Sequence, residues 1–548
     1  MKKPKYCFKC FIKKQIAKTH LNFELDEKYN NGTCLVPPMG WSSWNIFRNK
    51  INEDVIYSIA EAMKKSGLAD AGYEYINLDD CWQSSLRTKD GKLQGDLTTF
   101  PSGIKNLCEK VNDLGLKLGI YTSNGTLTCE DLPASLYNER IDAETFAEWG
   151  VEYFKYDFCH NITIPTKAPF IDSILVGGGN IKEKHYSVDN AILNGEARIV
   201  SEKNGKNYVK GLSSGIGSIT FNNVEVPDDG EYVLTLVLRK NKGGKTFCVV
   251  TVNNEDDYDL YIAETKAFSR EGREQIIVKL HKGINSITIC NPIGSKEDSA
   301  SRQYINMGEE LKRATKNYAI KNNCVEKPIL YSICEWGKNK PYKWGRRAGN
   351  IWRTTCDILP SWPSIVYNYE KTVKLAKYAG QGGFNDPDML EVGNGKLSYE
   401  ENKAHFTLWA MMSAPLILGN DVRTFLNEDG TPNNDNKILK ILTKKEIIDI
   451  DQDKLAIPCQ RVKTGLKDIL VKPLSNNRVA VCFFNKSFNK SNFSYNIDDL
   501  HNIMNVSLKK SQSYSCIEPW DDEKIIVTDK ISATVPSHGV KVFIISAL

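Results

Sequence analysis

The feature that most constrains the fold is a regular alternation of short apolar runs with helical patterns. Each run is rich in strand-forming residues, and several end in a carboxylate. Helical patterns separate them, near residues 54–66, 104–114, 143–149 and 307–323. Eight strands separated by helices predict an α/β fold, a (β/α)8 TIM barrel. The runs are 38–44 (PMGWSSW), 73–80 (YEYINLDD), 116–123 (LKLGIYTS), 151–157 (VEYFKYD), 329–336 (ILYSICEW), 351–358 (IWRTTCDI), 382–389 (GGFNDPDM) and 415–421 (PLILGND).

Polar residues gather near the C-terminal ends of these runs, which form the active-site face of such a barrel. Any one of them could cap a loop or form a structural ion pair. Ten at the same end of eight strands favour one shared polar pocket. They are Trp44, Asp79, Asp80, Tyr121, Lys155, Asp157, Glu335, Arg353, Asp357 and Asp388.

Asp157 ends the fourth run, and Lys155 lies two residues earlier on the same side of the strand. A lysine beside a carboxylate favours its ionised form, which a nucleophile needs. Several carboxylates, two cations and tryptophans, with no His or Cys placed as a base, suggest a site that binds sugar hydroxyls. Two carboxylates acting across one glycosidic bond would cleave it. The alternative is a divalent metal on Asp79, Asp80 and Asp157, as in barrels that enolise their substrates.

Composition narrows the classes of protein that fit. The 548 residues include 72 basic and 67 acidic ones, a net charge of +5 that is too small and dispersed to suggest nucleic acid. The N-terminus has no uninterrupted apolar stretch, so we predict neither a signal peptide nor a membrane span. The 15 cysteines follow no framework pattern, and the Cys7–Cys10 pair is a weak zinc signal. We therefore predict a cytoplasmic protein with mostly free thiols; the oligomeric state cannot be predicted.

Eight segments together resemble the α-galactosidase (melibiase) family of glycoside hydrolases, and they occur in the family's order. This resemblance implies a retaining enzyme on a (β/α)8 barrel, with no metal and no organic cofactor in the chemistry. Its substrates would be α-galactoside oligosaccharides or glycoconjugates. The segments are MGWSSWNIF, YINLDDCW, LGIYTSNGTLTC, KYDFC, SICEWG, IWRTTCDI, GGFNDPDML and LWAMMSAPLILGNDVR.

The resemblance also implies roles for single residues. Asp157 would be the nucleophile and Asp357 the general acid/base. Asp79 and Asp80 would bind the 4- and 6-hydroxyls of galactose, and Lys155 the 3- and 4-hydroxyls. Further contacts would come from Glu335 and Arg353 at the 2-hydroxyl, from Trp44 as an apolar wall and from Tyr121, while the role of Asp388 stays open.

Cysteines mark one departure from the family. The family commonly joins the cysteine of LDDCW to one after the first strand, but here Asn49 stands at about that partner position, so Cys81 lacks its disulfide. Cys129 and Cys159 match a second family disulfide, whose formation a reducing compartment would oppose.

The second departure is an insertion of about 140 residues between Asn161 and Arg302. Its runs alternate apolar and polar residues between turns, which predicts a β-sandwich. Segments such as GSITFNNVEVPDDGEYVLTLVLR resemble jelly-roll carbohydrate-binding modules. The alternative is a structural insert that shapes the rim of the cleft; because it leaves from the loop after the nucleophile strand, we expect it on the active-site face.

The predicted organisation has five segments. The chain ends in short alternating runs such as VAVCFFN, which predict a C-terminal antiparallel β-sandwich. The segments are an N-terminal extension (1–34), a first barrel part (35–165), the insert (166–301), a second barrel part (302–450) and the C-terminal domain (451–548).

A retaining α-galactosidase is the function that fits best. The alternatives are an α-N-acetylgalactosaminidase, a β-L-arabinopyranosidase and a non-catalytic galactoside-binding protein. Relatives specific for N-acetylgalactosamine have small residues where this chain has Glu335, and the arabinopyranosidases alter the acidic pair that is intact here as Asp79 and Asp80. A binding protein would lack one of the two catalytic carboxylates.

Overall fold

Within the described residues, eight parallel strands form one sheet in the order β18-β17-β16-β4-β3-β2-β1-β19. The structure is a computed structural model that describes residues 29–178, 181–239, 244–262 and 272–548. Each strand lies inside a run that the sequence predicts. The strands are β1 (Met39–Ser42), β2 (Tyr75–Asn77), β3 (Lys117–Ser123), β4 (Tyr153–Asp157), β16 (Leu330–Ile333), β17 (Ile351–Arg353), β18 (Phe384–Asp386) and β19 (Leu416–Leu418).

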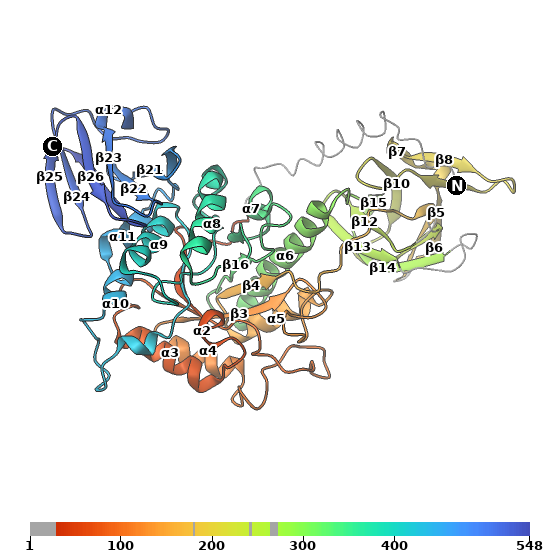
Figure 1. The fold of residues 1–548 in the computed structure, drawn as a ribbon. Coiled ribbons are helices and arrows are strands. Elements are labelled where there is room, and N and C mark those ends of the chain that lie inside the picture. The colour runs from red at the N-terminus through yellow and green to blue at the C-terminus, as the bar shows by residue number, and fades with distance from the viewer. Residues whose placement is uncertain (1–28, 179–180, 240–243, 263–271) are drawn as a thin grey trace, which may run out of the picture. The chain divides into compact units, whose positions relative to one another are not determined.

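The sheet curls until its two edges meet, as in a TIM-like barrel. Figure 1 labels its neighbouring strands β3, β4 and β16. Leu390, just after β18, pairs with Leu418 of β19, and its N–H donates to the carbonyl of Ile417 at 2.7 Å. Close approach of β1 and β2 requires Gly40, because a Cβ there would lie 2.5 Å from the Tyr75 carbonyl oxygen.

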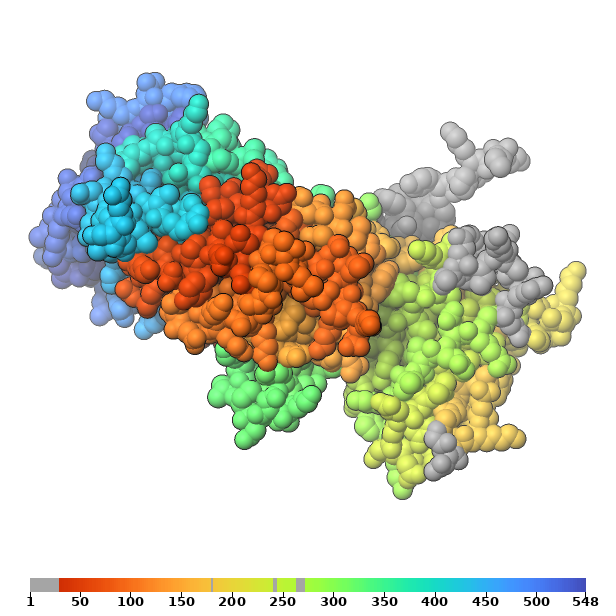
Figure 2. All heavy atoms as spheres, turned by 90° about the horizontal axis from the view of Figure 1, so that it is seen from below, coloured from red at the N-terminus to blue at the C-terminus, as the bar shows by residue number. Residues whose placement is uncertain are grey.

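Helices follow the barrel strands along the chain. Helix α3 shows why they form: the Asn52 side chain accepts from the Val55 N–H at 2.8 Å, and Ile56, Ile59 and Met63 are buried on one face. On one surface of the barrel, α3 adjoins the short 3-10 helix η4 (Val422–Phe425), as the neighbouring red and blue segments of Figure 2 show. Arg423 of η4 lies over the Phe47 ring. The helices are α2 (Trp44–Phe47), α3 (Glu53–Lys65), α4 (Ile104–Asp113), α5 (Glu139–Trp149), α6 (Lys296–Asn322), α7 (Gly345–Ala348), α8 (Trp362–Thr372), α9 (Tyr399–Met411), α10 (Lys437–Leu442) and α11 (Lys445–Asp451).

Residues 163–302 form a compact unit of their own, made of two antiparallel sheets around one apolar core. Ile174, Leu234, Val250 and Ile289 lie in this core. The arrangement agrees with a β-sandwich, while the jelly-roll connectivity stays a prediction. The strands are β5 (Phe170–Gly178), β6 (Ile181–Ser187), β7 (Ile192–Gly195), β8 (Arg198–Ser201), β9 (Asn207–Lys210), β10 (Gly217–Val226), β11 (Gly230–Arg239), β12 (Thr246–Val252), β13 (Asp256–Ile262), β14 (Gly272–Leu280) and β15 (Gly283–Cys290).

The barrel residues just before and just after this unit are hydrogen-bonded to each other. The Asn161 amide donates to Gln303 Oε1 at 3.0 Å and to the Asn124 carbonyl at 2.7 Å. Gln303 in turn donates to the Ile162 carbonyl at 2.9 Å. The barrel therefore holds the two connections of the insert side by side.

The C-terminal region is a second antiparallel β structure that packs on the barrel. Its six-stranded and two-stranded sheets share one apolar core. Helix α9 lies beneath it: the Trp520 indole donates to Thr407 at 3.1 Å, and buried Lys472 donates to the Ala410 carbonyl at 3.3 Å. The strands are β20 (Gln460–Lys463), β21 (Lys467–Leu474), β22 (Arg478–Asn485), β23 (Ser491–Asn496), β24 (Tyr514–Glu518), β25 (Glu523–Val527), β26 (Lys530–Val535) and β27 (Val540–Ala547), with the short helix α12 (Ile497–Leu500).

Of the predicted N-terminal extension, residues 1–28, including Cys7 and Cys10, lie outside the described residues. Tyr29 is buried and its N–H donates to the Arg346 carbonyl at 2.7 Å. Asn31 donates to the Ile329 carbonyl at 2.8 Å, next to the N-terminal end of β16. Among the described helices, none combines the length and apolar character needed to cross a bilayer.

Candidate active site

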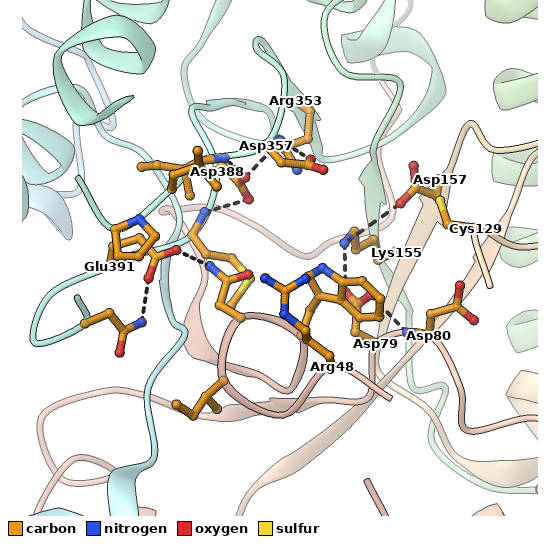
Figure 3. A pocket seen from close by; sticks show the side chains of 18 of the residues that line it. Arg48, Asp79, Asp80, Cys129, Lys155, Asp157, Arg353, Asp357, Asp388 and Glu391 are labelled. Atoms are coloured by element: carbon orange, nitrogen blue, oxygen red, sulfur yellow. Dashed lines mark hydrogen bonds and ion pairs between the residues drawn. The ribbon is translucent and has the colours of Figure 1, made fainter. Parts of the chain in front are cut away.

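A cavity of about 380 Å³ lies at the C-terminal ends of the barrel strands. Nine of the ten predicted site residues line it, and Figure 3 shows most of their side chains converging on one space. They are Trp44, Asp79, Asp80, Tyr121, Lys155, Asp157, Arg353, Asp357 and Asp388. The predicted shared pocket is present.

Lys155 is the centre of one half of the pocket. Its Nζ lies 2.7 Å from Asp79 Oδ2 and 4.0 Å from Asp157 Oδ2, and it sits 5.2 Å from the centre of the buried Tyr121 ring. Since β3 and β4 are paired neighbours, with Tyr121 opposite Lys155, the sheet itself fixes this cluster. Lys155 therefore pairs more closely with Asp79 than with the predicted nucleophile.

The predicted nucleophile is buried, and this changes its acidity. Burial raises the pKa of Asp157 to about 6, although Lys155 and the Phe158 N–H, which donates to Oδ1 at 2.8 Å, both act to lower it. Lys155 thus acts in the direction that the sequence predicts, but desolvation outweighs it.

Asp80 occupies a similar setting beside Asp79. Burial, followed by the charge of Asp79, raises the pKa of Asp80 to about 6. Its Oδ1 accepts from the Cys81 N–H at 2.8 Å and its Oδ2 from the Glu130 N–H at 3.0 Å. These backbone donors fix the carboxylate toward the pocket.

Arg353 organises the other half of the pocket. Its Nη2 lies 2.9 Å from Asp357 Oδ1 and 2.9 Å from Asp388 Oδ2. Partial desolvation by the pocket wall acts to raise the pKa of Asp357, but the positive charges of Arg353 and Lys155 outweigh it and hold that pKa below its usual value. The predicted acid/base thus binds its proton less tightly than the predicted nucleophile does.

Asp388, whose role the sequence leaves open, holds the Asp357 loop. Its Oδ2 accepts from the Ile358 N–H at 2.8 Å, and its Oδ1 accepts from the Met389 N–H at 2.8 Å. Burial raises the pKa of Asp388, with Arg353 opposing. By binding both Arg353 and the backbone beside Asp357, this carboxylate positions the predicted acid/base.

Glu335 is the exception among the predicted residues, because it does not line the cavity. It is 0% exposed, and its carboxylate accepts from the backbone N–H of Asn339 at 2.8 and 3.0 Å and from the Asn339 amide at 3.1 Å. The contact with the 2-hydroxyl that the resemblance implies for Glu335 stays a prediction. The turn after β16 takes up the carboxylate.

Five polar or aromatic residues of the wall were missed by the sequence interpretation. Glu391 accepts from Asn45 at 2.7 Å and from Asn394 at 2.5 Å, and burial raises the pKa of Glu391 to about 7. Trp336 stands within SICEWG and Glu391 just after NDPDM, so each adjoins a recognised motif without matching a predicted role. The missed residues are Asn45, Arg48, Trp336, Glu391 and Asn394.

The cysteines follow the sequence prediction. Cys129 and Cys159 form a disulfide, with Cα atoms 5.1 Å apart, that joins the loops after β3 and β4. Cys81 is free. The alternative of a divalent metal would need Asp79, Asp80 and Asp157 to bind one ion together. In the structure, Asp79 Oδ2 instead forms an ion pair with Lys155 at 2.7 Å.

A TIM-like barrel with a sugar-sized, carboxylate-rich pocket at its C-terminal face defines the class of carbohydrate-active barrel enzymes. The family model described as alpha galactosidase A matches residues 36–171 and 296–453, on either side of most of the insert. The model of the α-galactosidase C-terminal β-sandwich domain matches residues 464–545. The chain belongs to the α-galactosidase family of glycoside hydrolases and is an enzyme of that kind.

Individual relatives agree with this placement. The α-galactosidase of Coffea arabica is 31% identical over 520 residues, which cover 94% of this chain and 95% of that protein. The α-galactosidase of Cyamopsis tetragonoloba is 30% identical and covers 94% and 87% of the two chains. The crystal structure of α-galactosidase I from Mortierella vinacea superposes with a TM-score of 0.64 at 26% identity, covering 94% and 98%.

Proposed function

We propose that this protein hydrolyses terminal non-reducing α-D-galactosyl residues with retention of configuration. The observation that carries this proposal is one pocket holding two carboxylates in different settings. The Asp157 side chain is 7% exposed at the end of β4, whereas the Asp357 side chain is 71% exposed on the loop after β17. Double displacement needs one carboxylate that attacks and one carboxyl group that first donates a proton and then accepts one, and this pocket offers a candidate for each.

The proposed reaction has two steps. Asp157 attacks the anomeric carbon while Asp357 gives its proton to the leaving glycosidic oxygen, which forms a galactosyl ester on Asp157 and releases the aglycone alcohol. Asp357, now ionised, takes a proton from water, and the resulting attack on the anomeric carbon frees Asp157 and galactose. Two inversions retain the α configuration.

The remaining pocket residues are proposed to recognise galactose. Asp79 and Asp80 accept from the 4- and 6-hydroxyls, Lys155 donates to the 3- and 4-hydroxyls, and Arg353 serves the 2-hydroxyl. Trp44 gives an apolar wall and Tyr121 a further contact. An epimer with a misplaced hydroxyl leaves these buried groups unpaired, which costs about 1–3 kcal/mol for each group.

A panel of aryl glycosides tests the substrate assignment and the part of Glu335. We expect α-galactosides to be cleaved at least roughly 100-fold faster than N-acetylgalactosaminides, β-galactosides or β-L-arabinopyranosides. Glu335→Ser should narrow the first ratio, because it shortens the buried side chain and frees space at the Asn339 turn. Glu335→Gln keeps the volume and is the matched control. Equal rates of wild-type enzyme on galactosides and N-acetylgalactosaminides would overturn this assignment.

The opposite pKa shifts of the two carboxylates predict pH profiles that differ between substrates. An activated aryl galactoside needs only ionised Asp157, so its kcat/KM should rise as pH increases through about 6. An unactivated disaccharide needs Asp157 ionised and a proton on Asp357, so that the two carboxyl groups together hold one proton. Because the pKa of Asp357 is lowered, Asp157 and Asp357 have lost this last shared proton above about pH 6, and kcat/KM for the disaccharide should fall there. Profiles of kcat/KM measure this directly, and identical profiles for both substrates would contradict the assignment.

The insert is proposed to influence which galactosides reach the pocket, because the chain enters it a few residues after Asp157. Replacing residues 165–301 by a short loop should leave hydrolysis of a small aryl α-galactoside within roughly tenfold, about 1.4 kcal/mol. Activity on longer oligosaccharides should change more. Thermal unfolding establishes that the shortened chain is folded before its kinetics are compared. A folded deletion that treats short and long substrates alike would remove the insert from substrate choice.

A further inference from the structure

Two sulfur atoms and the carboxylate of the proposed nucleophile converge on one wall of the pocket. Ligand atoms of Cys129, Cys159 and Asp157 all lie within 4.8 Å of one another. Cys129 is exposed and lines the cavity, and Figure 3 shows it beside Asp157. Ligand atoms around a tetrahedral zinc ion are roughly 3.3–3.8 Å apart, so small side-chain movements would suffice to close a site.

We infer that, once the Cys129–Cys159 disulfide is reduced, both thiolates and the Asp157 carboxylate bind one thiophilic divalent cation such as Zn²⁺ or Cd²⁺. Three protein ligands and one water complete a tetrahedral site. The cation occupies the carboxylate that the proposed reaction uses for attack, so the metal-bound enzyme is inactive. The predicted loss of activity rests on the proposed function, because it assumes that Asp157 is the nucleophile. The predicted binding of the cation does not rest on it.

The reduction step is chemically ordinary. A dithiol attacks the exposed Cys129 sulfur as thiolate, the Cys159 sulfur leaves, and the second thiol of the reagent displaces Cys129 to form a cyclic disulfide. Two electrons and two protons pass to the protein, which gains two thiols. Binding of the cation then releases those two protons to solvent.

The charges around the site favour a cation. The described residues that line the cavity include three basic ones, Arg48, Lys155 and Arg353, and twice as many carboxyl groups. Arg353 is paired with Asp357 and Asp388, and Lys155 is closest to Asp79. The acidic lining residues are Asp79, Asp80, Asp157, Asp357, Asp388 and Glu391.

The nearest cation does not block the proposed ligand. Lys155 Nζ lies 4.0 Å from Asp157 Oδ2, outside hydrogen-bond distance, while the Phe158 N–H takes Oδ1. Oδ2 can therefore turn to an ion between the two sulfurs without breaking a close ion pair. The negative charge of Asp79 offsets the positive charge of Lys155, so Lys155 would repel such an ion only weakly.

Cd²⁺ binding to the full chain tests the inference, with thiolate-to-cadmium ultraviolet absorption and metal stoichiometry as readouts. Reduction should add one tightly bound Cd²⁺ per chain in wild-type protein and none in the Cys129→Ser/Cys159→Ser variant. Asp157→Asn should keep the thiolates but weaken the added site at least tenfold. Cys324→Ser/Cys356→Ser, which removes two exposed free thiols, is the matched control and should retain the added equivalent.

Activity supplies the second arm. Reduced wild-type enzyme should lose at least 90% of its α-galactosidase activity with Cd²⁺ and regain it with a chelator, whereas the oxidised enzyme should not respond. An added equivalent that persists in the double-serine variant, an affinity unchanged by Asp157→Asn, or unfolding of the chain on reduction would each overturn the site. Wild-type protein that binds the ion as expected but never cleaves α-galactosides would instead refute the proposed function.

Discussion

Asp157→Ala is expected to reduce turnover of an activated aryl α-galactoside by at least ~10⁴-fold, because it removes the carboxylate proposed to form the glycosyl ester. The side chain stands at the end of β4 and lines the cavity. Azide fits the space left by the truncated carboxylate and should restore part of the rate. A β-galactosyl azide product would show that attack now comes from the side where Asp157 stood.

The matched control is Asp131→Ala, which removes an exposed carboxylate whose ion-pair partner is His160. It lies on the loop between Cys129 and α5, and we expect its activity within about twofold of wild type. Asp157→Asn keeps the shape without the charge and should be as inactive as the alanine variant. Full activity in either Asp157 variant would remove this residue from the role of nucleophile.

Asp357→Ala is expected to separate substrates by their leaving groups. An unactivated disaccharide should lose roughly 10³-fold in kcat/KM, since its leaving oxygen needs a proton in the transition state. An aryl galactoside with an acidic phenol should lose less than about tenfold in kcat/KM, which reports only the first chemical step. Its kcat should fall further, because water then lacks a base and the glycosyl ester accumulates.

Rapid-quench kinetics would check that the glycosyl ester accumulates in Asp357→Ala. A burst of phenol equal to the enzyme concentration is the expected result. Asp388→Asn tests the positioning of Asp357, because it loosens Arg353 and the Ile358 backbone without removing the Asp357 carboxyl group. That variant should lose more kcat/KM on the disaccharide than on the aryl galactoside, as Asp357→Ala does, but by a smaller factor. Equal losses on both substrates in Asp357→Ala itself would assign Asp357 to binding.

The alternation of apolar runs and helices was enough to predict the barrel, because each strand is short, buried and bounded by turns. Chain direction alone then places Asp79, Asp157, Asp357 and the other strand-end residues on one face. The two-sheet character of the insert was also readable, since runs such as EQIIVKL alternate in the register that a half-buried strand requires.

Acidity and side-chain partners were less predictable, because both depend on neighbours that are remote in sequence. Lys155 stands two residues from Asp157, yet its closest carboxylate is Asp79, in the loop after β2. Desolvation of Asp157 depends on how deeply the barrel mouth buries it, which no local pattern encodes. Glu335 lies in a recognised motif, but the motif does not indicate that its carboxylate accepts a hydrogen bond from the backbone N–H of Asn339.

The hydrogen bonds between the two connections of the insert, at Asn161, Ile162 and Gln303, bear on how this enzyme folds. Strands β4 and β16 are neighbours in the barrel, with Tyr153 paired to Leu330, although the whole insert lies between them in sequence. Contacts so distant along a chain slow folding, since a long loop must close before they form. An insert with its own core can collapse first and bring Ile162 and Gln303 together. The barrel would then close around a short effective connection, and mutations that slow folding of the insert would delay the catalytic domain as well.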